Sequence, residues 1–145
     1  MQQLGRYSGS EQWRKALDVA TELKATADAL NLAPEQEWLR YVLGEAADAI
    51  RGSVLWAATS TPVPPAVDAD YLRQYVVAAD ATRGDAVVAS YFLSFAHSEG
   101  AVDDATYWRL GPDLNAVEAE MGAISRELTD RLGFDPYQDK SRPFD

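Results

Sequence analysis

Residues 72–97 read LRQYVVAADATRGDAVVASYFLSFAH, and this stretch decides the fold class. Its apolar and small residues recur at alternating intervals of three and four, the spacing that places side chains on one side of an α-helix. The rhythm crosses Arg83-Gly84-Asp85 without a phase break. We therefore expect one helix over 69–98, about 45 Å long at about 1.5 Å per residue. The stripe consists of Leu72, Tyr75, Ala79, Thr82, Ala86, Ala89, Leu93 and Ala96.

Two helices are expected before this one, over 10–31 and 34–59. The first follows serines suited to capping a helix, and the second opens with Pro34, which is favoured in a first turn. Both have apolar residues at helical spacing, which predicts a packing face on each. The first face consists of Trp13, Ala16, Ala20, Leu23, Ala27 and Leu30; the second consists of Trp38, Val42, Ala46, Ala49 and Trp56, broadened by Leu39, Leu43 and Ile50.

Proline and glycine divide the rest of the chain. Three prolines within 59–65 cannot continue a helix, so this segment is expected to link the second and third helices. Because Gly111-Pro112 follows soon after the preceding helix, we expect a short helix over 103–110 and a principal helix over 112–132, with one kinked helix as the alternative. Gly133 is a typical stop, and the aromatic residues beyond it predict a non-helical tail that lies on the bundle.

These elements predict an all-α fold. The chain has 145 residues, the size of one domain, so we expect a single helical-bundle domain over 1–145. Its architecture would be four main helices, with a Pro-rich linker between helices 2 and 3, a short extra helix before helix 4 and a non-helical C-terminal tail. No strand-like alternation of useful length argues against this interpretation.

Composition narrows the chemistry. The chain has no cysteine, which excludes disulfides and thiolate sites, and its formal net charge of -10 disfavours nucleic acid as a partner. No run of about 18 apolar residues and no secretory signal is found, so we expect a soluble cytoplasmic protein without a membrane partner. A single histidine excludes three-histidine metal sites and two Glu-x-x-His pairs, and no phosphate-binding glycine loop occurs. No cofactor, metal site or catalytic residue is therefore predicted.

A polar strip on helix 69–98 is the one candidate ligand site. It consists of Arg83, Ser90, Ser94 and His97, spaced so that they follow one side of the helix beside the apolar stripe. Such a strip would line a pocket, where Arg83 holds an anion and His97 transfers a proton. The alternative is structural: small serines allow close helix packing, and His97 lies favourably near the negative end of the helix dipole.

The same helix also has a second apolar side. A helix that is apolar nearly all round must be central in its domain or covered by something else. The cover would be the C-terminal tail, the segment around Tyr107 and Trp108, or a second copy of the protein, of which we favour the homodimer. We call this second side the seam; it consists of Val77, Ala81, Gly84, Val88, Tyr91 and Phe95.

Two functions follow from these features. The first is a non-catalytic protein-interaction module that self-associates or binds another protein, as adaptors, inhibitors and immunity-type proteins do. The second is a bundle that binds a small molecule, or an enzyme, built on the polar strip. An enclosed cavity at the strip would favour the second, and an exposed apolar patch would favour the first.

Overall fold

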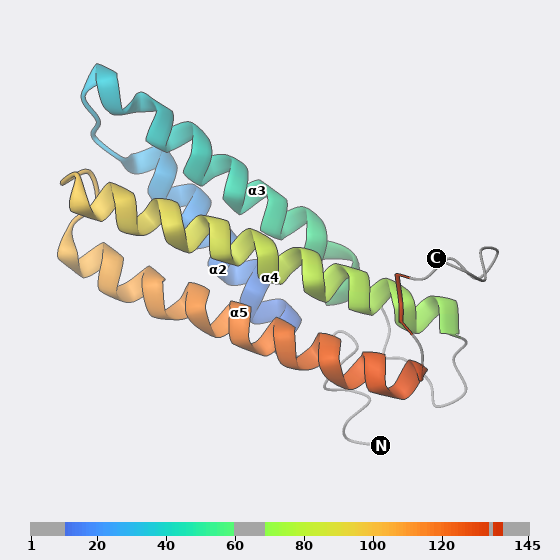
Figure 1. Cartoon of the computed structure of the whole chain (residues 1–145). Coiled ribbons are helices and arrows are strands. Elements are labelled where there is room, and N and C mark those ends of the chain that lie inside the picture. The colour runs from blue at the N-terminus through green and yellow to red at the C-terminus, as the bar shows by residue number, and fades with distance from the viewer. Residues whose placement is uncertain (1–10, 60–68, 134, 138–145) are drawn as a thin grey trace.

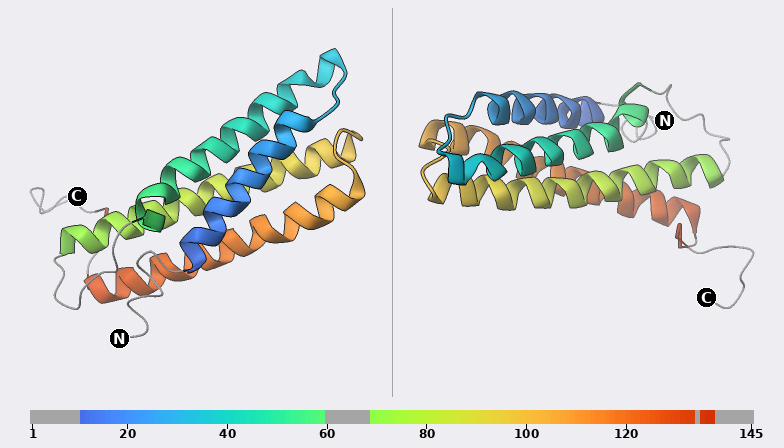
Figure 2. Two further views of the ribbon diagram at one scale, coloured as in Figure 1. Left: turned by 180° about the vertical axis from the view of Figure 1, so that it is seen from behind. Right: turned by 90° about the horizontal axis from the view of Figure 1, so that it is seen from above.

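The computed structural model describes residues 11–59, 69–133 and 135–137, and these form an all-α bundle, as the sequence predicts (Figure 1). The helices run alternately up and down. Around the bundle the order is α2, α3, α4, α5, and α5 closes the ring against α2. Figure 2 shows α2 from behind, lying between α3 and α5. The elements are α2 (Glu11–Ala29), the 3-10 turn η1 (Pro34–Gln36), α3 (Glu37–Thr59), α4 (Ala69–Ser98) and α5 (Asp104–Leu132).

Helix α4 has the bounds and the buried side that its sequence predicts. All eight residues of the predicted stripe are buried, and Tyr75 and Leu93 are wholly inaccessible to solvent. Thr82, the one polar member, is satisfied locally because its hydroxyl donates to the Ala78 carbonyl at 2.7 Å. One uninterrupted helix therefore spans the Arg83-Gly84-Asp85 segment.

Helix α5 corrects the prediction of two helices over 103–110 and 112–132. It is one helix that contains Pro112. The proline is exposed, so its ring points away from the packed side, and the flanking Leu110 and Leu114 are both buried. Pro112 removes one backbone donor, but the burial of residues on both sides of it holds the two halves on a common stripe. The stripe predicted after the proline is buried as expected: Leu114, Val117, Met121, Ile124 and Leu128.

Helices α2 and α3 bury most of the residues of their predicted packing faces, but the buried side of α3 has a different centre from the predicted one. The buried side of α3 is centred on Leu39, Leu43 and Ile50, whereas Trp38 is 45% exposed. The prediction that Trp38 and Ala49 belong to the packing face is therefore wrong, because Ala49 is exposed and Trp38 lies at the edge where α3 meets α4. The first turn of the predicted helix 34–59 is the 3-10 turn, and α2 ends at Ala29 rather than at residue 31.

Short-range interactions fix the helix ends. The Asp103 carboxylate accepts a hydrogen bond from the Thr106 N–H at 2.8 Å and so caps α5. Gly100 and Gly133 have φ angles of 78° and 76°, which end α4 and α5 in the left-handed conformation that glycine adopts without strain. None of the described helices is long and apolar enough to cross a lipid bilayer.

The linker predicted over 59–65 lies outside the described residues except for Thr59, which ends α3. Within the predicted tail, Pro136 is buried, and the Tyr137 hydroxyl donates to the Asp80 carboxylate of α4. Burial and the nearby Asp80 charge raise the pKa of Tyr137. This part of the tail therefore contacts the bundle, while Phe134 and residues 138–145 lie outside the described residues.

Candidate functional site

The polar strip lies along the boundary between α4 and α5. His97 Nε2 and Asp104 Oδ1 form a hydrogen bond of 2.6 Å, and the His97 ring stacks on Tyr107 with the ring centres 4.2 Å apart. The Ser94 and Tyr107 hydroxyls form a hydrogen bond of 3.1 Å. These contacts join the last turns of α4 to the first turns of α5.

Arg83 and Ser90 lie farther along the same boundary. A Cβ atom placed on Gly122 would lie 3.3 Å from Cδ of Arg83, so the missing side chain at Gly122 makes room for the arginine to cross α5. Ser90 is half-buried. The hollows described below, on the described part of the chain, have other walls, so no described cavity collects the four strip residues. Their role in binding a ligand stays a prediction.

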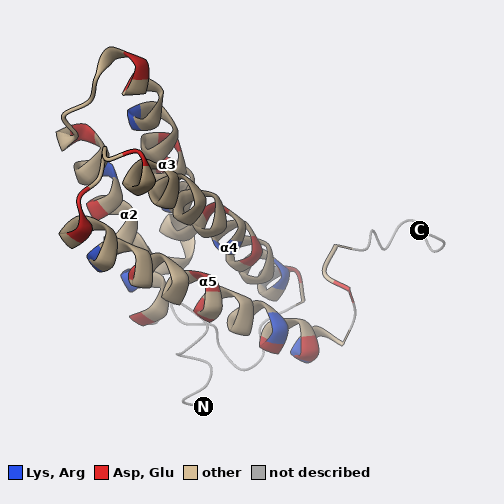
Figure 3. Cartoon of the chain, turned by 60° about the vertical axis from the view of Figure 1, so that its left-hand side comes forward, with Lys and Arg blue, Asp and Glu red and all other residues tan. Residues whose placement is uncertain are grey.

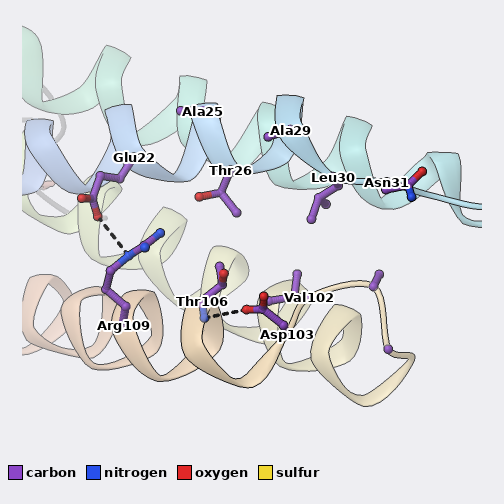
Figure 4. Close-up of a pocket in the computed structure, with 12 residues that line it drawn as sticks. Glu22, Ala25, Thr26, Ala29, Leu30, Asn31, Val102, Asp103, Thr106 and Arg109 are labelled. Atoms are coloured by element: carbon purple, nitrogen blue, oxygen red, sulfur yellow. Dashed lines mark hydrogen bonds and ion pairs between the residues drawn. The ribbon is translucent and has the colours of Figure 1, made fainter.

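A hollow of about 570 Å³ lies between α2 and α5 (Figure 4). In Figure 4, Glu22 of α2 and Arg109 of α5 reach toward each other across its mouth, and their charged atoms are 4.0 Å apart. A hydrogen bond from Thr106 lowers the pKa of Asp103 at its far wall. Among the described residues, no three His, Asp or Glu side chains gather closely enough to hold a metal ion. Of the charged groups that line this hollow, Glu22 and Arg109 lie within ion-pair distance of each other, and Asp103 accepts the hydrogen bond from Thr106.

The outer surface of α3 and α4 is apolar, in contrast to the hollow between α2 and α5 with its charged groups. Of the nine large hydrophobic side chains that are exposed in the described part of the chain, seven lie on these two helices, so the exposed apolar surface is concentrated rather than scattered. The second half of α4, from Ala86 to Ser98, has no Lys, Arg, Asp or Glu (Figure 3). The seven are Trp38, Tyr41 and Leu55 on α3 and Val77, Val87, Val88 and Tyr91 on α4.

The predicted seam forms the α4 half of this surface. Val77, Val88 and Tyr91 are between 43% and 66% exposed, Ala81 and Gly84 are exposed, and Phe95 is half-buried. The sequence analysis does not predict the α3 half, although the sequence of α3 contains a signal for it. Helix α3 has one apolar stripe through Leu39 and another through Trp38, and two stripes on one helix indicate that only one faces the core. We call the combined surface the α3–α4 face.

Aromatic rings gather at one end of the α3–α4 face. The Trp38 ring centre lies 5.4 Å from that of Phe95 and 6.2 Å from that of Phe92, and Tyr91 lies 5.3 Å from Phe92. Tyr41, 69% exposed, is on the same side of α3. Rings at these separations are rigid and have large apolar areas, which is the composition that protein interfaces favour.

Two apolar hollows lie along the groove between the helices. The first, about 400 Å³, is lined chiefly by Trp56, Val77, Ala78 and Ala81, with Ser53, Arg73 and Gln74 at its edge. The second, about 340 Å³, is lined by Tyr41, Val42, Glu45, Ala46, Ala49, Asp85, Val88 and Phe92.

Asp85 is one of the charged residues in this groove, which also include Glu45 and Arg73. It is half-buried and accepts a hydrogen bond of 3.2 Å from the Ser53 hydroxyl. Burial raises the pKa of the Asp85 carboxyl, and the hydrogen bond from Ser53 partly offsets the effect. The carboxylate is therefore solvated less well than an ordinary surface aspartate, in the middle of an apolar surface.

Of the three covers expected for the seam, the segment around Tyr107 lies elsewhere, and only the start of the tail belongs to the described residues. Tyr107 packs on His97 and hydrogen-bonds Ser94, on the α5 side of α4. Tyr137 hydrogen-bonds Asp80. Neither prevents the exposure of Val77, Val88 and Tyr91. The rest of the tail lies outside the described residues, and a second copy as the cover stays a prediction.

Comparisons of this chain with protein-family models, curated proteins and solved structures gave no match.

Proposed function

We propose that this chain is a non-catalytic protein-interaction module that acts through the α3–α4 face, and that its partner is a second copy of itself. The observation that carries the proposal is the concentration of exposed hydrophobic side chains on α3 and α4. Exposed apolar surface costs free energy in water, and a large contiguous patch is typical of a surface that binds another macromolecule.

The size of the face supports a stable contact. From Val77 to Phe95 it is about 27 Å long at about 1.5 Å per residue. It is two helices wide, or about 18 Å at an axis separation of about 9 Å. The flat projection is roughly 500 Å², and a ridged surface has a larger accessible area than its projection. The flat projection alone is about three fifths of the ~800 Å² per partner of a standard interface.

The experiment is light-scattering mass determination at tens of micromolar. One chain has a mass of 15.9 kDa, so the proposal expects about twice that mass, falling to the monomer value for Ala81→Glu and Val88→Glu. Ala119→Glu on α5 is the matched control, because it places the same charge on an exposed helical alanine away from the α3–α4 face. A wild-type chain that stays monomeric would contradict the homodimer. Equal loss of mass in the control would show that added charge alone is responsible.

A further inference from the structure

We infer that the second copy packs on the α3–α4 face in the antiparallel orientation, with the two-fold axis passing close to Ala81 and Gly84. This inference rests on the proposed function and specifies its geometry. In this arrangement α4 of one copy runs antiparallel to α4 of the other, and each end of the face meets the opposite end of its partner.

The glycines of the face support an axis near its middle. Gly52 and Gly84 lie in helix interiors, where glycine costs up to about 1 kcal/mol relative to alanine. A Cβ atom on either would meet no other atom within 4 Å, and neither has a positive φ. Packing within the chain therefore does not require glycine at these positions. Ser53 and Asp85 directly follow the two glycines in the chain and hydrogen-bond each other, so Gly52 and Gly84 lie at nearly the same level along the bundle. Because neither has a side chain, a second backbone can approach this part of the face closely.

The two ends of the face differ in shape, and this difference sets the orientation. One end is bulky, because Tyr41 and Tyr91 project from it with 69% and 66% of their areas exposed. The other end contains the larger hollow, lined by Trp56, Val77 and Ala81. An antiparallel two-fold places the bulky end of each copy over this hollow in its partner. A parallel two-fold would instead oppose the bulky ends to each other and leave the larger hollows facing each other.

The antiparallel arrangement has an electrostatic consequence at Asp85. This residue is one position beyond Gly84, so a two-fold axis near Ala81 and Gly84 brings the two Asp85 carboxyls toward each other. Each faces Ser53 of its own chain, with Tyr41 and Glu45 of α3 along the same hollow and Arg73 of α4 at the edge of the other. Bringing two carboxylates together opposes association while both are charged, so Asp85 limits the affinity at neutral pH.

The test uses single cysteines, because the natural chain has none and each introduced thiol is unique. A disulfide needs Cα atoms about 4.4–6.8 Å apart, so it reports which residues face each other. Under mild oxidation, Ala81→Cys and Gly84→Cys should each cross-link to a second copy of the same variant. Val77→Cys and Val88→Cys should not cross-link alone, but a mixture of the two should form the mixed dimer.

The outcomes separate this inference from the proposed function. Cross-linking of Val77→Cys and Val88→Cys each with itself, at least as fast as Gly84→Cys, would overturn the antiparallel orientation while keeping the α3–α4 face as the interface. No cross-linking at any of these positions, together with a monomeric wild-type mass, would contradict the proposed function itself. All four positions are exposed, and circular dichroism of each reduced variant establishes that it is folded.

Discussion

Two grooves on this bundle lie between neighbouring helices and contain opposite chemistry. The groove between α3 and α4 is mostly apolar, with Glu45, Asp85 and Arg73 as its charged residues. Its Asp85 carboxylate accepts a hydrogen bond from Ser53. The groove between α2 and α5 continues below the Glu22–Arg109 pair as a hollow of about 320 Å³. Apart from Val19, Ala116 and Val117, its walls are charged: Lys15, Asp18, Glu22, Asp113 and Glu120.

The difference shows why a hollow alone does not indicate a docking surface. Water removed from carboxylates and ammonium groups must be replaced by equally good partners, so covering the α2–α5 groove has a desolvation cost. Water removed from the α3–α4 face gains free energy in proportion to the apolar area, roughly 25 cal/mol per Å² before the costs of association. The α2–α5 groove is therefore stable in contact with water, whereas the α3–α4 face gains free energy when another surface covers it.

The largest effect should separate the two sides of α4. Leu93 is wholly buried in the core, so Leu93→Ala should lower the free energy of unfolding by about 2–5 kcal/mol, the usual range for a leucine truncated in a core. Tyr91, two residues away, is 66% exposed, so Tyr91→Ala should leave the monomer nearly as stable and weaken self-association. Urea unfolding at low concentration and light scattering at high concentration measure the two effects. Similar losses of monomer stability in both variants would contradict the assignment of Tyr91 to the outer face.

The next effect concerns the carboxyl in the α3–α4 groove. Asp85→Asn should tighten the dimer roughly tenfold at neutral pH, or about 1.4 kcal/mol, because it removes charge that association must desolvate. Burial raises the pKa of Asp85 in the folded chain, so the folded protein binds this proton more readily than the unfolded chain. The destabilising charge is thus present above that pKa and is lost as pH falls through it. Sedimentation measurements from about pH 7 down toward the usual aspartate range of about pH 4 should show acid-strengthened association in the wild type and a weaker pH response in Asp85→Asn.

The control for the pH experiment is Asp18→Asn on α2. It removes an equal charge from the α2–α5 groove, which the proposed dimer leaves uncovered. It should change the dissociation constant less than twofold, roughly 0.4 kcal/mol. If both variants tighten the dimer equally, the net charge of -10 governs association and Asp85 has no special place in it.

A continuous helix is predictable from the sequence where the apolar residues on both sides of a glycine- or proline-containing segment keep the same helical spacing. The rhythm across Arg83-Gly84-Asp85 correctly predicts one α4. The same rhythm crosses Gly111-Pro112, since Leu110, Leu114 and Val117 keep intervals of four and three. The proline nevertheless predicts a helix start there, which the single helix α5 contradicts. An exposed proline costs a helix one hydrogen bond, and the buried residues on either side outweigh that cost.

The α3–α4 face is harder to predict from the sequence than the helices are, because it depends on which helices are neighbours in the fold. The seam on α4 is predictable from its periodicity. Its extension onto α3 needs the knowledge that Trp38 lies against Phe92 and Phe95, and these residues are more than 50 positions apart in the chain. Likewise, Ser53 and Asp85 form a pair only because α3 and α4 pack in one register. A polar strip such as Ser94 and His97 is visible in the sequence, but its partner helix is not.

A smaller effect is expected from salt, and its sign distinguishes the two grooves. The chain has a net charge of -10, so two copies repel each other at long range. Raising NaCl from about 50 mM to about 500 mM screens this repulsion and should tighten the homodimer severalfold. A basic partner that used the charged α2–α5 groove would show the reverse, because salt weakens attraction between opposite charges. Sedimentation equilibrium at the two salt concentrations measures the sign for the purified chain. Weaker self-association in high salt would contradict an apolar interface.

The smallest effect should come from His97, which lies on α4 but on the side that meets α5. Its hydrogen bond to Asp104 joins two partly exposed groups, with side-chain exposures of 28% and 87%, and such surface pairs contribute up to about 1 kcal/mol. His97→Ala should therefore lower the melting temperature by only a few degrees and leave the mass of the dimer unchanged, since the α3–α4 face does not include this ring. Light scattering and thermal unfolding of the same sample check both expectations. Loss of the dimer in His97→Ala with an intact fold would move the interface to the α4–α5 boundary and would contradict the contrast between the two sides of α4.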